Sequence, residues 1–210
     1  MNSLGRKALT AAWMSIVLGL VLQGVLLLVT WRWPASVVAD LMGRITWSVL
    51  VCTALVVGSV AAQAQSGLVG LVGLLAAPAA FAVARLVQKG LVAWLGALTA
   101  VASALPPGPF ELALAKGVEY GLFGLAMTAL RERRGSFGRH VLVGGLIGLM
   151  MAGYLALRGT AGGPVADWTP LIGAAVNELL FPVGCATVLW ATVAAPEYVS
   201  ERARPRANPA

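Results

Sequence analysis

The residues of this chain that could do chemistry are ionisable side chains within long apolar segments. They are Arg85, Lys89, Glu111, Lys116, Glu119 and Glu178, with Gln88 and Asn177 as neutral polar neighbours. Ionisable groups are costly inside a membrane span and commonly face the bundle interior or a water-filled cavity. Lys116 and Glu119 are three residues apart, so on a helix they can pair on one face. Glu119 and Glu178 could also pair with Arg85 or Lys89 across helices.

Motifs for the common kinds of catalysis are missing from the sequence. It contains no GxxxxGK[ST], the P-loop of nucleotide hydrolysis, and neither HExxH nor GxSxG. The single histidine, His140, and the two cysteines, Cys52 and Cys185, lack the spacing of a metal site. We therefore expect a protein that is not an enzyme and that binds no metal or cofactor.

The amino-acid composition indicates whether these groups lie in a soluble or a membrane protein. Of the 210 residues, 59% are hydrophobic and 11% are charged, and the mean hydropathy is +0.86. Soluble domains carry about 25% charged residues, so a soluble fold could not hide this much apolar surface. The net charge of +7 does not indicate nucleic acid as a partner, because the basic residues cluster at the ends of apolar runs, as topology signals do. The sequence therefore predicts a membrane protein in contact with lipid.

The apolar runs predict an all-α bundle of six transmembrane helices in one membrane domain covering residues 1–210. The expected spans are 8–30, 45–64, 79–102, 109–130, 140–158 and 168–194, near the roughly 20 residues that cross a bilayer. The stretch 67–105 is ambiguous because Pro78 interrupts it. We expect residues 67–78 to form a short or broken helix before Pro78.

The distribution of basic residues predicts the orientation. If 67–105 crosses once and the N-terminus is cytoplasmic, nine basic residues of the loops and tails lie inside and three outside. If it crosses twice, three lie inside and eleven outside. Cytoplasmic loops are enriched in Lys and Arg, so we predict one crossing, with both termini in the cytoplasm. The expected location is a bacterial-type cytoplasmic membrane.

In this orientation, polar and aromatic groups from several helices gather in the outer half of the bundle. The candidate substrate-binding residues are Lys116, Glu119, Tyr120, Tyr154, Asn177, Glu178 and Trp94, and Gln23 reaches the same level. Apolar walls with a few placed polar groups suit a small polar, aromatic-like molecule. A structural ion-pair network that only fixes helix packing is the alternative. The other tryptophans considered, Trp31, Trp33, Trp47 and Trp168, are expected in the interfacial aromatic belt.

Small residues mark one face of the first helix. Ala8 and Ala12 are four residues apart, and such a face lets another helix approach closely. That helix could belong to a partner subunit or to this chain.

Four passages together resemble the substrate-binding S components of energy-coupling-factor vitamin transporters. They are the Ala8/Ala12 face, the Lys-Gly-Val-Glu-Tyr-Gly segment within residues 115–124, the Gly-Tyr segment within residues 150–155, and the helix-six segment of residues 175–180. In the last segment Asn177 is similar to the start of an Asn-x-x-Gln pattern, whereas Glu178 and Leu180 depart from that pattern.

The resemblance implies a fold of six helices and a function in uptake. An S component binds a vitamin or its precursor in the outer half of the bundle. It docks through its first helix, here Ala8 and Ala12, onto a coupling membrane subunit driven by ATPases. The residues carried over as pocket candidates are Lys116, Glu119, Tyr154 and Asn177.

Other functions stay open at this stage. The chain could be a non-catalytic structural subunit of a larger membrane complex, in which case Lys116, Glu119 and Glu178 would form closed ion pairs without a cavity. It could be a stand-alone ion-coupled permease with carboxylates along a continuous path. The two carboxylates favour a cationic or hydrogen-bond-donating ligand, and Lys116 cancels part of that preference.

Overall fold

Helices make up nearly all of the residues that the structure describes. The computed structural model describes residues 3–31, 36–61, 67–95, 108–133, 136–161 and 167–196. These ranges contain no strand. The six α-helices are α1 (Ser3–Thr30), α2 (Val37–Ala61), α3 (Gly67–Trp94), α4 (Pro109–Glu132), α5 (Phe137–Thr160) and α6 (Thr169–Leu189), and a π-helix, η1 (Trp190–Ala194), continues α6.

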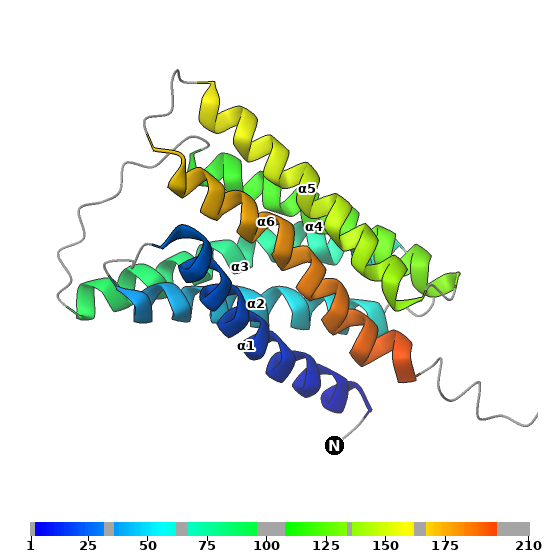
Figure 1. The fold of residues 1–210 in the computed structure, drawn as a ribbon. Helices are drawn as coiled ribbons and strands as arrows, with labels where there is room; N and C mark the ends of the chain where they lie inside the picture. The colour runs from blue at the N-terminus through cyan, green and yellow to red at the C-terminus, as the bar shows by residue number, and fades with distance from the viewer. Residues whose placement is uncertain are drawn as a thin grey trace, which may run out of the picture.

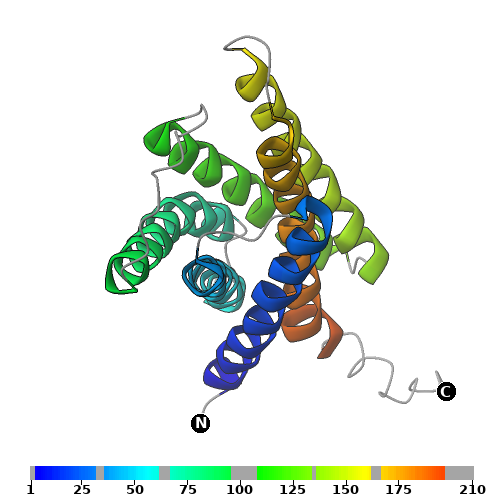
Figure 2. The same ribbon diagram turned by 60° about the vertical axis from the view of Figure 1, so that its left-hand side comes forward.

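Successive helices run in opposite directions, and the first and last helices of the bundle are in contact. Each helix contacts the next along the chain, α1 also contacts α6, and α2 contacts α6 across the interior. The start of α1 and the end of η1 lie at one end of the bundle, whereas α1 ends and α2, α4 and α6 begin at the other (Figure 1). Figure 2 shows α1 and α6 side by side, with α3 and α4 on the opposite side of α2.

Most of the helices are suited to a lipid bilayer. Five are long and apolar enough to span a membrane: α1, α2, α3, α5, and α6 together with η1. Helix α4 is similar in length but carries Glu111, Lys116, Glu119 and Arg131. The prediction of an all-helical, multi-pass membrane protein is thus confirmed. That α4 is a sixth span, and that both termini are cytoplasmic, stay predictions.

The third helix differs from the one predicted. It begins at Gly67 and continues through Pro78 to Trp94, so the expected break before Pro78 is absent and the predicted start at residue 79 is wrong. The missing side chain of Gly117 on α4 makes room for the proline, because a Cβ there would lie 3.0 Å from Pro78 Cγ. Prolines are tolerated within membrane helices where neighbouring helices accommodate them. The remainder of that predicted span, 96–102, and residues 62–64 of the second span lie outside the described residues.

Aromatic and small side chains fill the centre of the bundle. Tyr120, Phe123 and Phe181 are fully buried, and Trp47 packs edge-on against Tyr120 with 5.7 Å between ring centroids. Cys52 and Cys185 meet beside this cluster with 2.8 Å between their sulfur atoms, as free cysteines. This packed layer separates the polar end of the bundle, described next, from the end where α1 starts.

Candidate substrate-binding site

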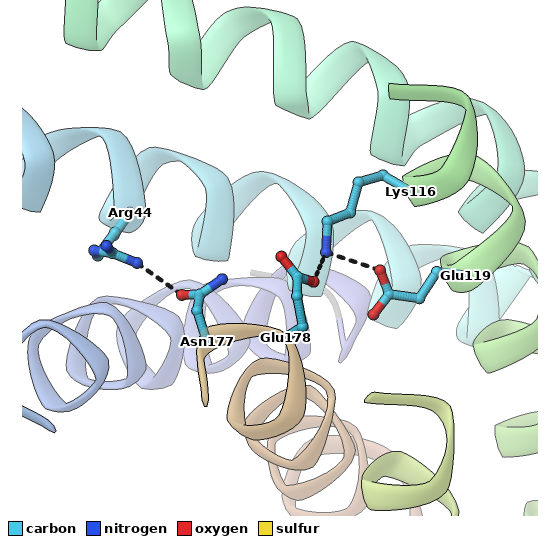
Figure 3. Close-up of polar contacts among 5 residues, drawn as sticks. All are labelled: Arg44, Lys116, Glu119, Asn177 and Glu178. Atoms are coloured by element: carbon cyan, nitrogen blue, oxygen red, sulfur yellow. Dashed lines mark hydrogen bonds and ion pairs between the residues drawn. The ribbon is translucent and has the colours of Figure 1, made fainter. Parts of the chain in front are cut away.

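A buried ionic triad joins α4 to α6. Lys116 Nζ lies 2.8 Å from Glu119 Oε2 and also donates to Glu178 Oε2 (Figure 3). All three side chains are buried, and Lys116 Nζ lies 5.8 Å from the centre of the Trp47 ring. One cation therefore serves two carboxylates, and Glu119 Oε1 is buried with no hydrogen-bond partner among the described residues.

A second charged group, Arg44 of α2, is held by neutral amides. Its Nε donates to Gln23 Oε1 of α1 at 2.6 Å, and its Nη1 donates to Asn177 Oδ1 of α6 at 2.7 Å (Figure 3). Asn177 directly precedes Glu178 on α6. Two consecutive residues of this helix therefore contact Arg44 and Lys116. These hydrogen bonds fix the guanidinium between three helices without neutralising its charge.

Asp40 lies one turn before Arg44 on the same helix. Its Oδ1 accepts a hydrogen bond of 2.5 Å from Gln88 Nε2 of α3. Asp40 and Arg44 have the spacing at which helical ion pairs form, but no ion pair between them is found among the described residues. Each charge instead has an uncharged partner on another helix.

Two adjoining cavities surround these groups. The first, of about 210 Å³, lies between α2, α3, α4 and α6. The second, of about 530 Å³, lies between α1, α2 and α6. Asp40, Arg44, Asn177 and Glu178 line both cavities. A ligand pocket in proteins typically measures about 300–1,000 Å³, so the larger cavity is of ligand size by itself and the smaller one extends it.

The first cavity combines aromatic walls with charge. Trp47, Phe81 and Phe181 line it, and Trp47 lies 6.2 Å from Phe81 and 5.8 Å from Phe181, measured between ring centroids. Arg85 also lines it, with its guanidinium carbon 5.6 Å from the centre of the Phe81 ring. Flat apolar surfaces next to fixed charges can hold a ring that bears polar substituents.

The structure brings together only part of the predicted site. Lys116, Glu119, Asn177 and Glu178 come close together as expected. Tyr120 is next to them but is fully buried, with its hydroxyl lacking a partner among the described residues and lining neither cavity. Of the pairings that the sequence allows, the one within α4 is formed: Lys116 contacts both carboxylates, and no ion pair of Arg85 or Lys89 is found in the part of the chain described.

Two predicted aromatic residues lie elsewhere. Trp94 is 81% exposed at the end of α3 and lines neither cavity. Tyr154 donates to Glu111 Oε1 at 2.6 Å, and Glu111 also pairs with Arg158 at 2.9 Å. These three residues form a separate, solvent-accessible cluster between α4 and α5. Of the tryptophans expected in an interfacial belt, Trp47 is instead part of the interior.

Buried small residues of α1 lie next to the predicted docking face of Ala8 and Ala12. The buried small residues are Ala11, Ser15 and Gly19, and a Cβ at Gly19 would lie 3.1 Å from the Ile45 Cα of α2. This stripe serves packing within the chain. Ala8 and Ala12 are half-buried beside it, and their role as a docking face stays a prediction.

Sequence reasoning missed the contribution of α2. The predicted second span begins at residue 45, so Asp40 and Arg44 fall outside it, and Arg44 is one of the three basic residues counted as outer. The helix begins at Val37, which puts both residues on its first turns and inside the bundle. The available signal was Asp40 itself, since acidic residues favour the first turn of a helix.

Comparison of the chain with models of known protein families, with curated proteins and with solved structures found no match. Within the described residues, no cluster of His, Cys, Asp or Glu could hold a metal ion. The fold and the site define a multi-pass helical membrane protein with a charged, partly aromatic cleft at one end of its bundle.

Proposed function

We propose that this protein is the substrate-binding membrane subunit of an uptake system for a vitamin or vitamin precursor. In this proposal six helices span a bacterial-type cytoplasmic membrane, with both termini inside. The cleft between α2 and α6 then opens on the outer side. A coupling membrane subunit and ATPases supply the energy and dock through Ala8 and Ala12 of α1.

One observation carries the proposal: two adjoining cavities share Asp40, Arg44, Asn177 and Glu178 at one end of the bundle. Fixed charges are costly in a membrane protein and mark substrate sites. A purely structural network would need no space beside it. Phe181 lines the first cavity and packs against the fully buried Tyr120, and such a packed aromatic layer suits a binding subunit better than a permease with a path to both sides.

A second function, a non-catalytic structural subunit, is favoured by the triad. Lys116, Glu119 and Glu178 pair with one another, as expected for groups that fix helix packing. The triad can serve as the base of the cleft while the ligand contacts Arg44 and Asn177, so the two functions differ in whether a small molecule is bound.

Native mass spectrometry of the protein purified in mild detergent distinguishes them. We expect the wild-type protein to carry a vitamin-sized adduct. The variants Arg44→Gln and Asn177→Leu should lose most of it, because a hydrogen bond that involves a charged group contributes about 1.5–3 kcal/mol, or roughly tenfold or more in affinity. Arg158→Gln is the matched control, since Arg158 pairs with Glu111 outside both cavities. An empty wild-type protein that copurifies with large membrane subunits would refute the binding function and support the structural one.

A further inference from the structure

Opposite charges are kept apart on one face of α2. Asp40 and Arg44 are four residues apart, a spacing that normally allows an ion pair. In the described structure Asp40 accepts its hydrogen bond from Gln88, and Arg44 donates to Gln23 and Asn177. Three amides from three other helices thus hold one carboxylate and one guanidinium in place.

Both charges have capacity for a further partner. A guanidinium has five N–H donors and a carboxylate two acceptor oxygens. The hydrogen bonds of Arg44 start from Nε and Nη1, and that of Asp40 ends on Oδ1. Both residues line both cavities, so a ligand bound there would lie beside both.

Asp40 and Glu178 are the acidic groups that act electrostatically on Arg44, without forming an ion pair with it. Glu119 and Glu178 both pair with Lys116, and no carboxylate of the described residues forms an ion pair with Arg44. Arg44 and Asp40 are thus one positive and one negative position about one helical turn apart, both lining both cavities, and neither is in an ion pair. Arg85, likewise without an ion pair among the described residues, lines the first cavity only.

We infer that the substrate is a zwitterion that carries an aromatic ring. Its anionic group binds Arg44, its cationic group binds Asp40, and its ring lies against Trp47, Phe81 and Phe181 in the first cavity. A singly charged ligand would bind only one of these two positions and would leave the hydrogen-bonding capacity of the other unused, which is costly where water is excluded. This inference rests on the proposed function and names the chemical class of the substrate.

Three probes that share a phenylethyl skeleton and differ in charge test the inference. They are phenylalanine as the zwitterion, phenethylamine as the cation and 3-phenylpropionate as the anion, each titrated into the purified protein by calorimetry. We expect phenylalanine to bind roughly tenfold more tightly than either singly charged probe.

The variants assign each charge to its partner. Arg44→Gln should remove the preference for phenylalanine over phenethylamine, and Asp40→Asn should remove the preference over 3-phenylpropionate. Arg158→Gln should keep both preferences. Circular dichroism of each variant establishes that it is folded, and the wild-type preferences can be measured without any variant.

The inference is overturned if the three probes bind equally, if a singly charged probe binds most tightly, or if none binds. Native mass spectrometry of the wild-type protein separates this failure from that of the proposed function. If the wild-type protein carries an adduct but does not prefer phenylalanine over the other probes, the proposed function is retained and the substrate class is refuted. A protein with neither adduct nor probe binding refutes both.

Discussion

Replacing Lys116 with methionine should destabilise the protein by about 3–5 kcal/mol, since it leaves Glu119 and Glu178 buried without their cation. Both carboxylates contact Lys116 Nζ, and the Glu119 side chain is only 1% exposed. Removing one partner of a buried ionic group lowers the free energy of unfolding by far more than the intact group contributes to it, because the remaining charges stay buried without a counter-charge. Denaturant titration in detergent, followed by circular dichroism, measures the change.

The matched control removes the whole triad. A triple variant, Lys116→Met with Glu119→Gln and Glu178→Gln, should regain most of the lost stability, because replacing a complete buried ionic group by neutral side chains is often neutral or stabilising. If the Lys116→Met variant and the wild-type protein have the same midpoint of denaturation, the triad is not the buried ionic group described above.

Gly73→Ala should give the second large effect, a loss of about 1–3 kcal/mol or more from overpacking. A Cβ at Gly73 would collide with the backbone carbonyl of Tyr120 on α4. Backbone cannot move aside as a flexible side chain can, so α3 and α4 would have to separate. This would also shift Lys116 and Tyr120, and we expect weaker adduct retention along with lower stability.

Gly90→Ala is the control for this substitution on the same helix. A Cβ at Gly90 would meet nothing within 4 Å, so the change should be neutral or slightly stabilising through the higher helix propensity of alanine. Equal melting temperatures for Gly73→Ala and Gly90→Ala would show that α3 and α4 do not pack as closely as described.

The sequence allowed the helices and part of the site to be predicted, for identifiable reasons. Long apolar runs are a strong signal of membrane helices. Lys116, Glu119 and Glu178 were found because charge is conspicuous within such runs. Their partners were harder to assign, since a helix that is apolar all round has no polar face to show which side points inward.

The errors have physical causes as well. Pro78 was interpreted as a helix break, although a proline in a membrane helix can be accommodated by a glycine on its neighbour, here Gly117. Arg44 was missed because a charge near the end of an apolar run looks the same whether it lies in a loop or on the first turns of the helix. Trp47 was assigned to the interface because its contacts with Phe81 and Phe181 come from distant parts of the chain.

Thiol labelling in intact cells most directly tests the central claim, an outward-facing cleft that admits small molecules. Ala174 lines the larger cavity, Ser136 is exposed just before α5 at the opposite end of the bundle, and the native Cys52 and Cys185 are fully buried. We expect a membrane-impermeant maleimide to label Ala174→Cys in intact cells, and Ser136→Cys only after permeabilisation. The reverse pattern, or an Ala174→Cys variant that stays unlabelled from both sides, would contradict the claim.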